Sequence, residues 1–371
     1  MMPIPVILIA LITVFNNYPL LHSADISHFS LEDKIGQLMM ISFEGTTIPE
    51  DIERVIREKS IGGIIYYRSN CEAGPHRVKS LSESLQNIPK QTRRPPLIIA
   101  IDQEGGRVQR LYGDTIAVIP SQYFLGLCNI PLLTLTSAQR VGEQLRRAGI
   151  TMNFAPVADV ITGPQTVIGD RSFSSDPHIA SLHVKAALEG YKNARIAATF
   201  KHFPGHGSTP KDSHTELPVV DKTLQELTNH DLVPFSDSIS QAPAIMTAHV
   251  LYPQIDPDNP ATTSKTILQR LLRKQLGYNG VTISDSLTME GILKNKDLIK
   301  VSIEALGAGC DILLYGKKIL NDGSLGSVSS EEIATIHTAL VSAVRAGIIP
   351  VEQIDQSVQR VLTLKSCYTS P

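Results

Sequence analysis

The feature that most constrains the fold of this chain is the regular alternation of short apolar runs with longer helical patterns. Helical patterns lie between most of the runs, for example at 75–86 and 136–148, and another at 333–346 follows the last. Such spacing requires parallel strands joined by crossover helices. Eight of these units predict an α/β fold, a closed (β/α)8 barrel of the TIM type. The runs are 38–43, 62–67, 96–101, 152–157, 197–203, 244–250, 280–284 and 311–315.

The organisation around these units is simple. Ser30 precedes Glu32 and Asp33 and is typical of an N-cap, so we expect a helix that runs from there towards Met39. No internal repeat, low-complexity tract or linker interrupts residues 25–371, which we predict to form a single barrel domain. A doubly wound open sheet is the alternative, but no G-x-G-x-x-G loop follows the first strand to support it.

The N-terminus carries an apolar run at 5–15, PVILIALITVF. This run is shorter than the roughly 20 residues that span a bilayer, but it suits the core of a signal peptide. Ser23 and Ala24 offer a cleavage site, although no Lys or Arg precedes Lys34 and no Cys is nearby for lipid attachment. We therefore predict a leader at 1–24, export to the periplasm or cell exterior, and no membrane span after its removal. An uncleaved anchor, a misassigned start and a cytoplasmic protein are the alternatives.

The composition excludes several classes of function. With 34 Lys plus Arg against 36 Asp plus Glu, the chain lacks the basic excess of a nucleic-acid-binding protein. The four cysteines form no C-x-x-C pair, which argues against a disulfide framework and a zinc ribbon. Trp is absent, so a sugar ligand would be held mainly by polar side chains rather than by broad aromatic platforms.

Polar residues follow several of the predicted strands directly. Asp102, Asp159, Lys201, His202 and Asp285 each lie at the carboxyl end of an apolar run. In a (β/α)8 barrel, the carboxyl ends of the strands form the catalytic face. The sequence therefore predicts an active site built from these positions.

The densest cluster is 201–207, KHFPGHG, followed by Asp212, Ser213 and His214. In an extended segment, Asp212 and His214 would point to the same side. The carboxylate could then hold one imidazole nitrogen while the other faces a substrate, which suits proton transfer near the ordinary histidine pKa of about 6.5.

Three histidines in this cluster, His202, His206 and His214, also suggest a metal site, because imidazole is the commonest zinc ligand. Their spacing lies in a Pro-Gly loop and lacks the helical H-E-x-x-H context, so we expect no metal. A purely structural role is the alternative for His206 in particular.

Asp285 ends the apolar run at 280–284 and is a candidate nucleophile. Its alternative role is the N-cap of a helix that begins at Leu287. Two glycine-containing loops supply further charges: 101–110, with Asp102 and Arg110, and 168–173, with Arg171. For these charges the alternative is a solvated loop position.

Taken together and in this order, these stretches resemble glycoside hydrolase family 3, and in particular its single-domain bacterial β-N-acetylglucosaminidases of cell-wall recycling. The resemblance runs from about Ser30 to Val361. It implies that Asp285 is the nucleophile, that His214 is the general acid/base and that Asp212 is its partner. It further implies that N-acetylglucosamine is bound by Asp102, Arg110, Arg171, Lys201 and His202. Relatives often carry a second Asp after the nucleophile, where this chain has Ser286.

The resemblance implies a β-N-acetylhexosaminidase that removes terminal non-reducing β-linked N-acetylglucosamine by a retaining double displacement, with no metal or organic cofactor. Peptidoglycan fragments are the expected substrates. Phosphorolysis is a minor alternative, because a deprotonated His repels an anionic acceptor less than a carboxylate does. Three alternative hypotheses remain: a β-glucosidase, a metal-dependent hydrolase on the same barrel, and a sugar-binding barrel without catalysis.

Overall fold

The computed structural model describes residues 25–113, 116–163, 166–213, 215–293, 296–319 and 324–369. The predicted leader at 1–24 lies outside these residues, as does His214. All eight predicted strands are present in the expected order. They are β1 (Met39–Ile41), β2 (Gly63–Tyr66), β3 (Ile98–Ile101), β4 (Met152–Asn153), β5 (Ala197–Phe203), β6 (Ala244–Thr247), β7 (Val281–Ile283) and β8 (Leu313–Tyr315).

The strands form one parallel sheet that closes into a barrel. From β1 to β7 each strand pairs with the next one in the chain, and β8 pairs with β1. A parallel bridge between Ile283 and Ile312 closes the remaining gap between β7 and β8. The predicted (β/α)8 barrel is therefore confirmed, and the open doubly wound sheet is wrong.

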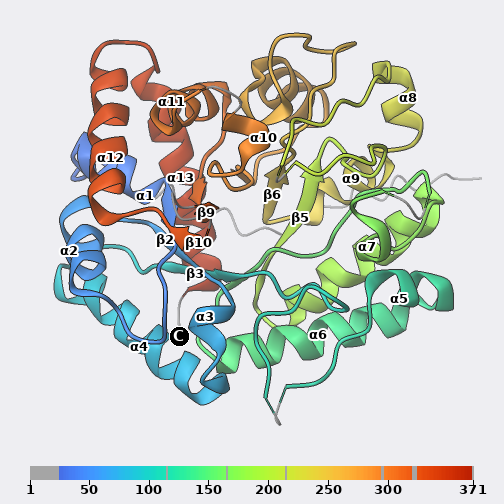
Figure 1. The fold of residues 1–371 in the computed structure, drawn as a ribbon, viewed down its shortest axis with the longest axis horizontal. Helices are drawn as coiled ribbons and strands as arrows, with labels where there is room; N and C mark the ends of the chain where they lie inside the picture. The colour runs from blue at the N-terminus through green and yellow to red at the C-terminus, as the bar shows by residue number, and fades with distance from the viewer. Residues whose placement is uncertain are drawn as a thin grey trace, which may run out of the picture.

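Helices surround the barrel (Figure 1). The helical patterns predicted at 75–86, 136–148 and 333–346 correspond to α4 (Gly74–Gln91), α6 (Pro131–Arg147) and α12 (Ser330–Arg345). The α-helices are α1 (Leu31–Gln37), α2 (Glu50–Lys59), α3 (Arg68–Cys71), α4 (Gly74–Gln91), α5 (Gln122–Cys128), α6 (Pro131–Arg147), α7 (Pro177–Asn193), α8 (Leu224–Asn229), α9 (Val233–Ser238), α10 (Glu290–Leu293), α11 (Leu298–Ala308), α12 (Ser330–Arg345) and α13 (Val351–Tyr368). A π-helix, η4, spans Thr266–Gln275, and short 3-10 turns occur at η1 (Gly169–Arg171), η2 (Ile239–Gln241) and η3 (Ala261–Thr263).

The first helix begins where the sequence predicts. The Ser30 side chain accepts a hydrogen bond from the Asp33 backbone N–H, and the Asp33 carboxylate accepts one from the Ser30 N–H. This reciprocal capping box satisfies two of the backbone donors that a helix start leaves unpaired. The predicted N-cap at Ser30 is confirmed.

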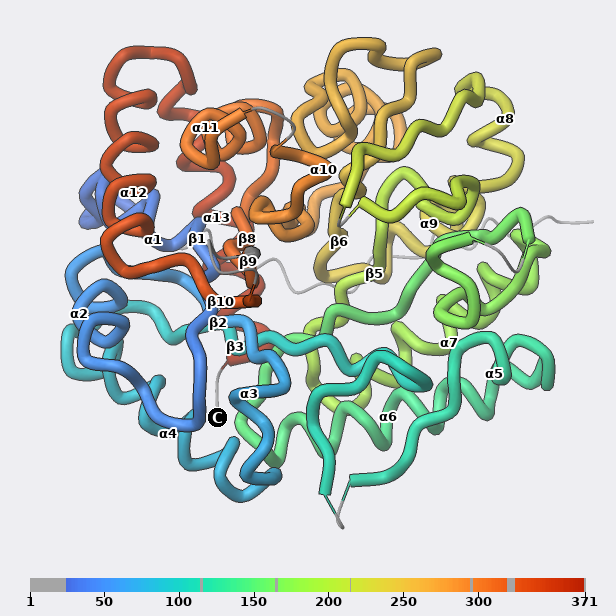
Figure 2. Tube along the Cα trace, viewed as in Figure 1, coloured from blue at the N-terminus to red at the C-terminus, as the bar shows by residue number. Residues whose placement is uncertain are grey.

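The first and last helices of the described chain pack together. Helix α1 packs against α12 and α13, so blue and red segments lie side by side on the left of Figure 2. Lys34 of α1 pairs with Asp355 of α13 at 2.6 Å. The first and last helices thus join the outer layer beside β1 and β8, the strands whose pairing brings the two ends of the sheet together.

One feature beyond β8 was not predicted. The strands β9 (Lys317–Ile319) and β10 (Leu325–Ser327) form an antiparallel pair outside the barrel sheet.

Across the residues that the structure describes, no helix is both long enough and apolar enough to cross a membrane.

Candidate active site

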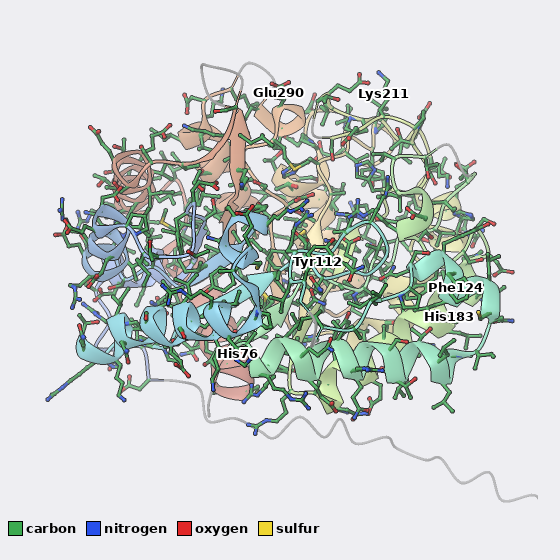
Figure 3. The ribbon with its side chains drawn as sticks, turned by 60° about the horizontal axis from the view of Figure 1, so that its bottom comes forward. His76, Tyr112, Phe124, His183, Lys211 and Glu290 are labelled. Atoms are coloured by element: carbon green, nitrogen blue, oxygen red, sulfur yellow. The ribbon has the colours of Figure 1, made fainter. Side chains whose placement is uncertain are left out.

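The charged residues singled out in the sequence gather at the carboxyl ends of the strands. Asp102 follows β3, Asp159 lies in the segment after β4, Lys201 and His202 belong to the end of β5, and Asp285 follows β7. Glu290, beyond β7, lies along the upper edge of the molecule in Figure 3 together with Lys211, from the loop after β5. The predicted positions of these residues at the carboxyl ends of the strands are therefore confirmed.

The end of β5 is irregular. The pairing register of β5 against β6 shifts between Phe200 and Phe203, and the Lys201–His202 peptide bond is cis. Both Lys201 and His202 are buried. Strand β5 ends with two consecutive buried polar side chains, followed by Phe203.

Lys201 lies in a buried network of opposite charges. Its ammonium group contacts Asp102 at 2.8 Å and Glu104 at 2.7 Å. Glu104 is also bound by both the Nε and an Nη of Arg171, each at 2.8 Å. This bidentate pairing fixes the guanidinium plane as well as its charge. Three elements of the barrel, the ends of β3 and β5 and the loop after β4, are thereby connected.

The network controls the protonation of its members. Burial alone would raise the pKa of Glu104, but Arg171 and Lys201 outweigh it and hold that pKa well below its usual value. Burial alone would lower the pKa of Lys201, and Asp102 and Glu104 reverse that effect and raise it. The site therefore presents fixed charges at neutral pH, which suits recognition of hydroxyl and amide groups.

The loop that carries Arg171 is anchored from α5. The Gln122 side chain donates to the carbonyl oxygens of Val157 and Arg171 and accepts from the Val157 N–H. Arg107 pairs with Asp170 at 2.9 Å and so joins the loops after β3 and β4. Arg171 is therefore held through its backbone as well as through its side chain.

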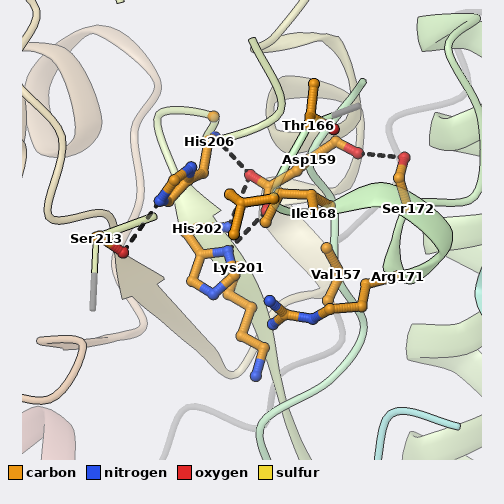
Figure 4. Close-up of polar contacts among 12 residues, drawn as sticks. Val157, Asp159, Thr166, Ile168, Arg171, Ser172, Lys201, His202, His206 and Ser213 are labelled. Atoms are coloured by element: carbon orange, nitrogen blue, oxygen red, sulfur yellow. Dashed lines mark hydrogen bonds and ion pairs between the residues drawn. The ribbon is translucent and has the colours of Figure 1, made fainter. Parts of the chain in front are cut away.

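A second buried cluster surrounds Asp159 (Figure 4). The carboxylate accepts hydrogen bonds from His202 Nδ1 at 2.6 Å, from the His202 N–H and from the His206 N–H. Burial would raise the pKa of Asp159, but His202 and then His206 lower it. Asp159 thus orients His202, whose Nδ1 donates to it.

His206 has a structural contact with the neighbouring loop. Its Nε2 lies 3.1 Å from the hydroxyl of Ser213, which precedes His214. Burial, and after it the nearby His202, lowers the pKa of His206 to about 4. His206 is therefore neutral near pH 7, which agrees with the structural alternative for this residue and makes it unsuited to act as the general acid.

The loop after β5 also contacts the segment after β7. The Gly291 N–H donates to the Ser213 carbonyl at 3.2 Å, and the Asp212 carbonyl accepts from Thr215 and Glu216. Asp212 thus lies in a loop that reaches the neighbourhood of Asp285. Because the predicted partner His214 is outside the described residues, the pairing of Asp212 with His214 stays a prediction.

Asp285 is half-buried immediately beyond β7, and its Oδ1 accepts a hydrogen bond from the Ser286 N–H at 2.7 Å. No helix begins at Leu287, because turns follow Asp285 and α10 starts only at Glu290. The N-cap alternative for Asp285 is therefore wrong.

Tyr67, directly after β2, connects the two sides of the site. Burial raises the pKa of its hydroxyl, and Asp102 and Asp285 raise it further while Arg110 lowers it. The charges of Asp102, Arg110 and Asp285 thus all act on this hydroxyl. The Nε atom of Arg110 is buried and makes no hydrogen bond to any described residue, and the role of Arg110 in binding the sugar stays a prediction.

The sequence analysis assigned no site role to Glu104 or Tyr67, and it placed Asp159 at a strand end of the site without a particular role. Glu104 had a signal, since it lies two residues beyond Asp102 on the same predicted loop, and Asp159 lies at a predicted strand end. Tyr67 closes the apolar run at 62–67 and carries no such signal. Within the described residues, no group of three His, Cys, Asp or Glu side chains is arranged to hold a metal ion.

A barrel that closes in this way and collects its charged side chains at the carboxyl ends of its strands belongs to the class of (β/α)8-barrel enzymes. The particular family is glycosyl hydrolase family 3. The glycosyl hydrolase family 3 N-terminal domain matches residues 30–364, so the chain belongs to this family.

Similar proteins carry consistent names. A beta-hexosaminidase of Idiomarina loihiensis is 35% identical over 82% of this chain and 93% of its own length. Beta-hexosaminidase A of Pseudoalteromonas piscicida is 34% identical over 86% of this chain, which spans only 56% of that longer protein.

Solved structures agree in fold. A family 3 beta-N-acetylglucosaminidase from Paenibacillus superposes with a TM-score of 0.86 at 39% identity, covering 91% of this chain and 62% of that one. A beta-N-acetylhexosaminidase from Beutenbergia cavernae gives a TM-score of 0.81 at 29% identity and covers 91% of this chain and 98% of that one.

Proposed function

We propose that this chain is a retaining β-N-acetylhexosaminidase that removes terminal β-linked N-acetylglucosamine, with Asp285 as nucleophile and His214 as general acid/base. The observation that carries the proposal is that Asp285 and the charge network of Asp102, Lys201, Glu104 and Arg171 lie at the carboxyl ends of the barrel strands. Relatives named beta-hexosaminidase at 34 to 36% identity support the choice of sugar.

In the first step, a carboxylate oxygen of Asp285 forms a bond to the anomeric carbon while the bond from that carbon to the aglycone oxygen breaks. The departing oxygen keeps the electron pair and takes a proton from His214. In the second step, water gives a proton to His214 and bonds to the anomeric carbon, and the Asp285 carboxylate leaves with its electron pair. Two inversions retain the configuration of the sugar.

The polar network suits the recognition of this sugar. Lys201 and Arg171 supply donors, and Asp102 supplies acceptors for hydroxyl and acetamido groups. Charge-assisted hydrogen bonds contribute about 1.5 to 3 kcal/mol each, so a few of them suffice for recognition without an aromatic platform.

The first test is turnover of 4-nitrophenyl N-acetyl-β-D-glucosaminide, compared with the corresponding glucoside, in the presence of EDTA. We expect hydrolysis of the N-acetylated substrate and its loss in Asp285→Ala, with folding unchanged by circular dichroism. An active Asp285→Ala protein would contradict the nucleophile assignment. Loss of activity in EDTA would favour a metal-dependent hydrolase, and preference for the glucoside would favour a β-glucosidase.

His214→Ala extends the same test to the acid/base. Proton donation contributes about 10² to 10⁴-fold when the leaving oxygen is basic. We therefore expect a much larger loss with a disaccharide substrate than with the nitrophenyl glycoside, whose leaving group needs little protonation. Equal losses on both substrates would reduce His214 to a binding residue.

Export and cell-wall fragments belong to the same proposal. The apolar run at 5–15 supports a cleaved leader, and a peptidoglycan fragment is the N-acetylglucosaminide that an exported bacterial enzyme of this family would meet. N-terminal sequencing of protein from the native host should begin near Ala24 or Asp25. Protein that retains Met1 in the cytosol would contradict export.

A further inference from the structure

We propose that His249 and Ser286 are positioning residues for the nucleophile, which fix the backbone beside Asp285 from the two neighbouring strands. The inference rests on the proposed role of Asp285 and goes beyond it, since the side chains of both residues bond to protein groups beside Asp285. Both are buried, His249 completely so.

The contact from the β6 side is made by His249, two residues beyond that strand. Its Nε2 lies 2.9 Å from the Ser286 carbonyl oxygen. A carbonyl only accepts, so Nε2 carries the proton and donates it. On the other side of the ring, Nδ1 lies 2.8 Å from the Thr262 hydroxyl, which in turn contacts Thr247 of β6. The ring orientation is therefore fixed at both nitrogens.

The contact from the β8 side is made by the Ser286 hydroxyl. It accepts a hydrogen bond from the Gly316 N–H at 3.1 Å and lies 2.7 Å from the Thr288 hydroxyl. Thr288 donates its proton to the Lys317 carbonyl at 2.6 Å, so the Ser286 hydroxyl must donate to Thr288. Ser286 thus uses both its donor and its acceptor to join the segment after β7 to the end of β8.

The approach of these segments leaves no space for a side chain at Gly316. A Cβ atom there would lie 2.2 Å from the Tyr67 hydroxyl and 2.6 Å from the Ser286 hydroxyl. The close approach lets the Gly316 N–H reach Ser286 and places Tyr67 against the same junction.

The consequence for Asp285 follows from its own hydrogen bond. The Ser286 N–H donates to Asp285 Oδ1 at 2.7 Å, so the orientation of that peptide sets the orientation of the carboxylate. His249 holds the carbonyl of Ser286, and Gly316 and Thr288 hold its side chain. Because a misplacement of about 1 Å can cost about 10²-fold in rate, loss of either contact is expected to slow glycosyl transfer to Asp285.

The test uses His249→Leu, which removes the donor, and His249→Gln, whose amide N–H can replace Nε2–H. The matched control is His337→Leu: His337 is buried on the outer helix α12, and its Nε2 lies 2.9 Å from the Glu32 carbonyl. Ser286→Ala is compared with Ser286→Thr, which keeps the hydroxyl. Its control is Ser357→Ala. Ser357 is a buried serine on α13, and its hydroxyl donates to Asp311.

Three quantities separate positioning from general structure. They are the rate constant of nitrophenolate release in a single turnover, the inhibition constant of free N-acetylglucosamine, and the urea midpoint of unfolding. We expect His249→Leu and Ser286→Ala to lower the single-turnover rate by about 10 to 10²-fold with an inhibition constant within about threefold of the parent. His249→Gln and Ser286→Thr should recover most of the rate.

Rate losses in His249→Leu and Ser286→Ala no larger than in their controls would overturn the inference, as would rates that follow the unfolding midpoints across all variants. The proposed function fails separately. If Asp285→Ala stays active, the nucleophile is misassigned; if it is inactive while the His249 and Ser286 variants match their controls, only the positioning role is wrong.

Discussion

At the scale of single residues, the site is organised by Glu104, a carboxylate that two cations share. Glu104 is almost fully buried, and its two oxygens contact Arg171 and Lys201. Removing one partner of a buried ion pair leaves an uncompensated charge, whereas an exposed pair contributes little. Glu104 therefore supports both the stability of the fold and the placement of substrate-binding cations.

We predict that Glu104→Gln loses about 3 to 5 kcal/mol of unfolding free energy at pH 7 and raises the KM for the nitrophenyl glycoside. The folded-state pKa of Glu104 lies below its ordinary value of 4.5, so its stabilisation is present above that pH and declines as the pH falls. The difference from the parent should shrink between pH 7 and about pH 3.5. Urea unfolding at both pH values measures it.

The control for this variant is Glu143→Gln. Glu143 forms an exposed pair with Arg147 at 3.9 Å on α6 and should change the unfolding free energy by less than about 1 kcal/mol. Equal losses of unfolding free energy in Glu104→Gln and Glu143→Gln would show that the buried network stabilises the fold no more than an exposed ion pair does.

The sequence predicts the residues of the site better than their connections. Asp102, Lys201 and Asp285 were found because each ends an apolar run, and the fold confirms their common face. The pairing of Glu104 with both Arg171 and Lys201 joins three segments that are distant in the chain. No local sequence pattern therefore predicts it. Tyr67 was missed for the same reason.

At the scale of elements, α5 shows how a helix outside the barrel sheet fixes the position of a site residue, Arg171. Its Gln122 holds the backbone of Arg171, and its Gly126 packs directly on the loop beyond. A Cβ atom at Gly126 would lie 1.8 Å from the Phe173 carbonyl oxygen. The glycine is therefore needed for close approach rather than for a special backbone conformation.

We predict that Gly126→Ala costs about 1 to 3 kcal/mol of unfolding free energy and raises KM more than it lowers kcat, because α5 must move away from the loop of Arg171. Gly307→Ala on α11 is the matched control. A Cβ atom at Gly307 meets nothing closer than 3.8 Å, so this change should stabilise by about 0.5 to 1 kcal/mol through helix propensity. Thermal unfolding and steady-state kinetics on both variants measure the contrast. A destabilised Gly126→Ala with unchanged KM would contradict the link to Arg171.

Elements with a strong local signal were predictable, and those set by packing were not. The eight strands and the start of α1 follow from apolar runs and a capping box. The β9–β10 pair lies outside the barrel sheet, in a segment without alternating apolar residues, and the sequence analysis missed it. The alternative role of Asp285 as an N-cap is wrong because turns, rather than a helix, follow β7.

At the scale of the whole molecule, the contact of α1 with α13 brings the first and last helices of the described chain together. At this contact lies Lys365, a fully buried lysine whose ammonium donates to Gln37 at 2.7 Å. Gln37 in turn donates to the Ser60 carbonyl. Among the residues that the structure describes, no carboxylate pairs with Lys365, whereas Lys34 at the same helix pair contacts Asp355.

This lysine should make the stability of the molecule depend on pH in the alkaline range. Burial lowers the pKa of Lys365 from 10.5 to about 7. Between these two values the unfolded chain binds a proton that the folded chain has released, so the unfolding free energy rises with pH. We predict that the parent gains stability relative to Lys365→Met as the pH increases from 7 to about 10. Urea unfolding of both proteins at several pH values measures the difference.

Other groups titrate alike in the parent and in Lys365→Met, so their effects cancel in the difference in unfolding free energy. The change of this difference with pH, rather than its value at one pH, therefore reports on Lys365. The absolute value at pH 7 combines two opposing effects, because the methionine removes a buried amine but leaves the Gln37 oxygen without its donor, which costs about 1 to 3 kcal/mol. Lys34→Met, at the same contact of α1 and α13, controls for loss of any lysine there. A difference between parent and Lys365→Met that stays constant from pH 7 to about 10 would mean that Lys365 keeps its proton in the folded protein, and that the contact between the first and last helices accommodates a buried charge.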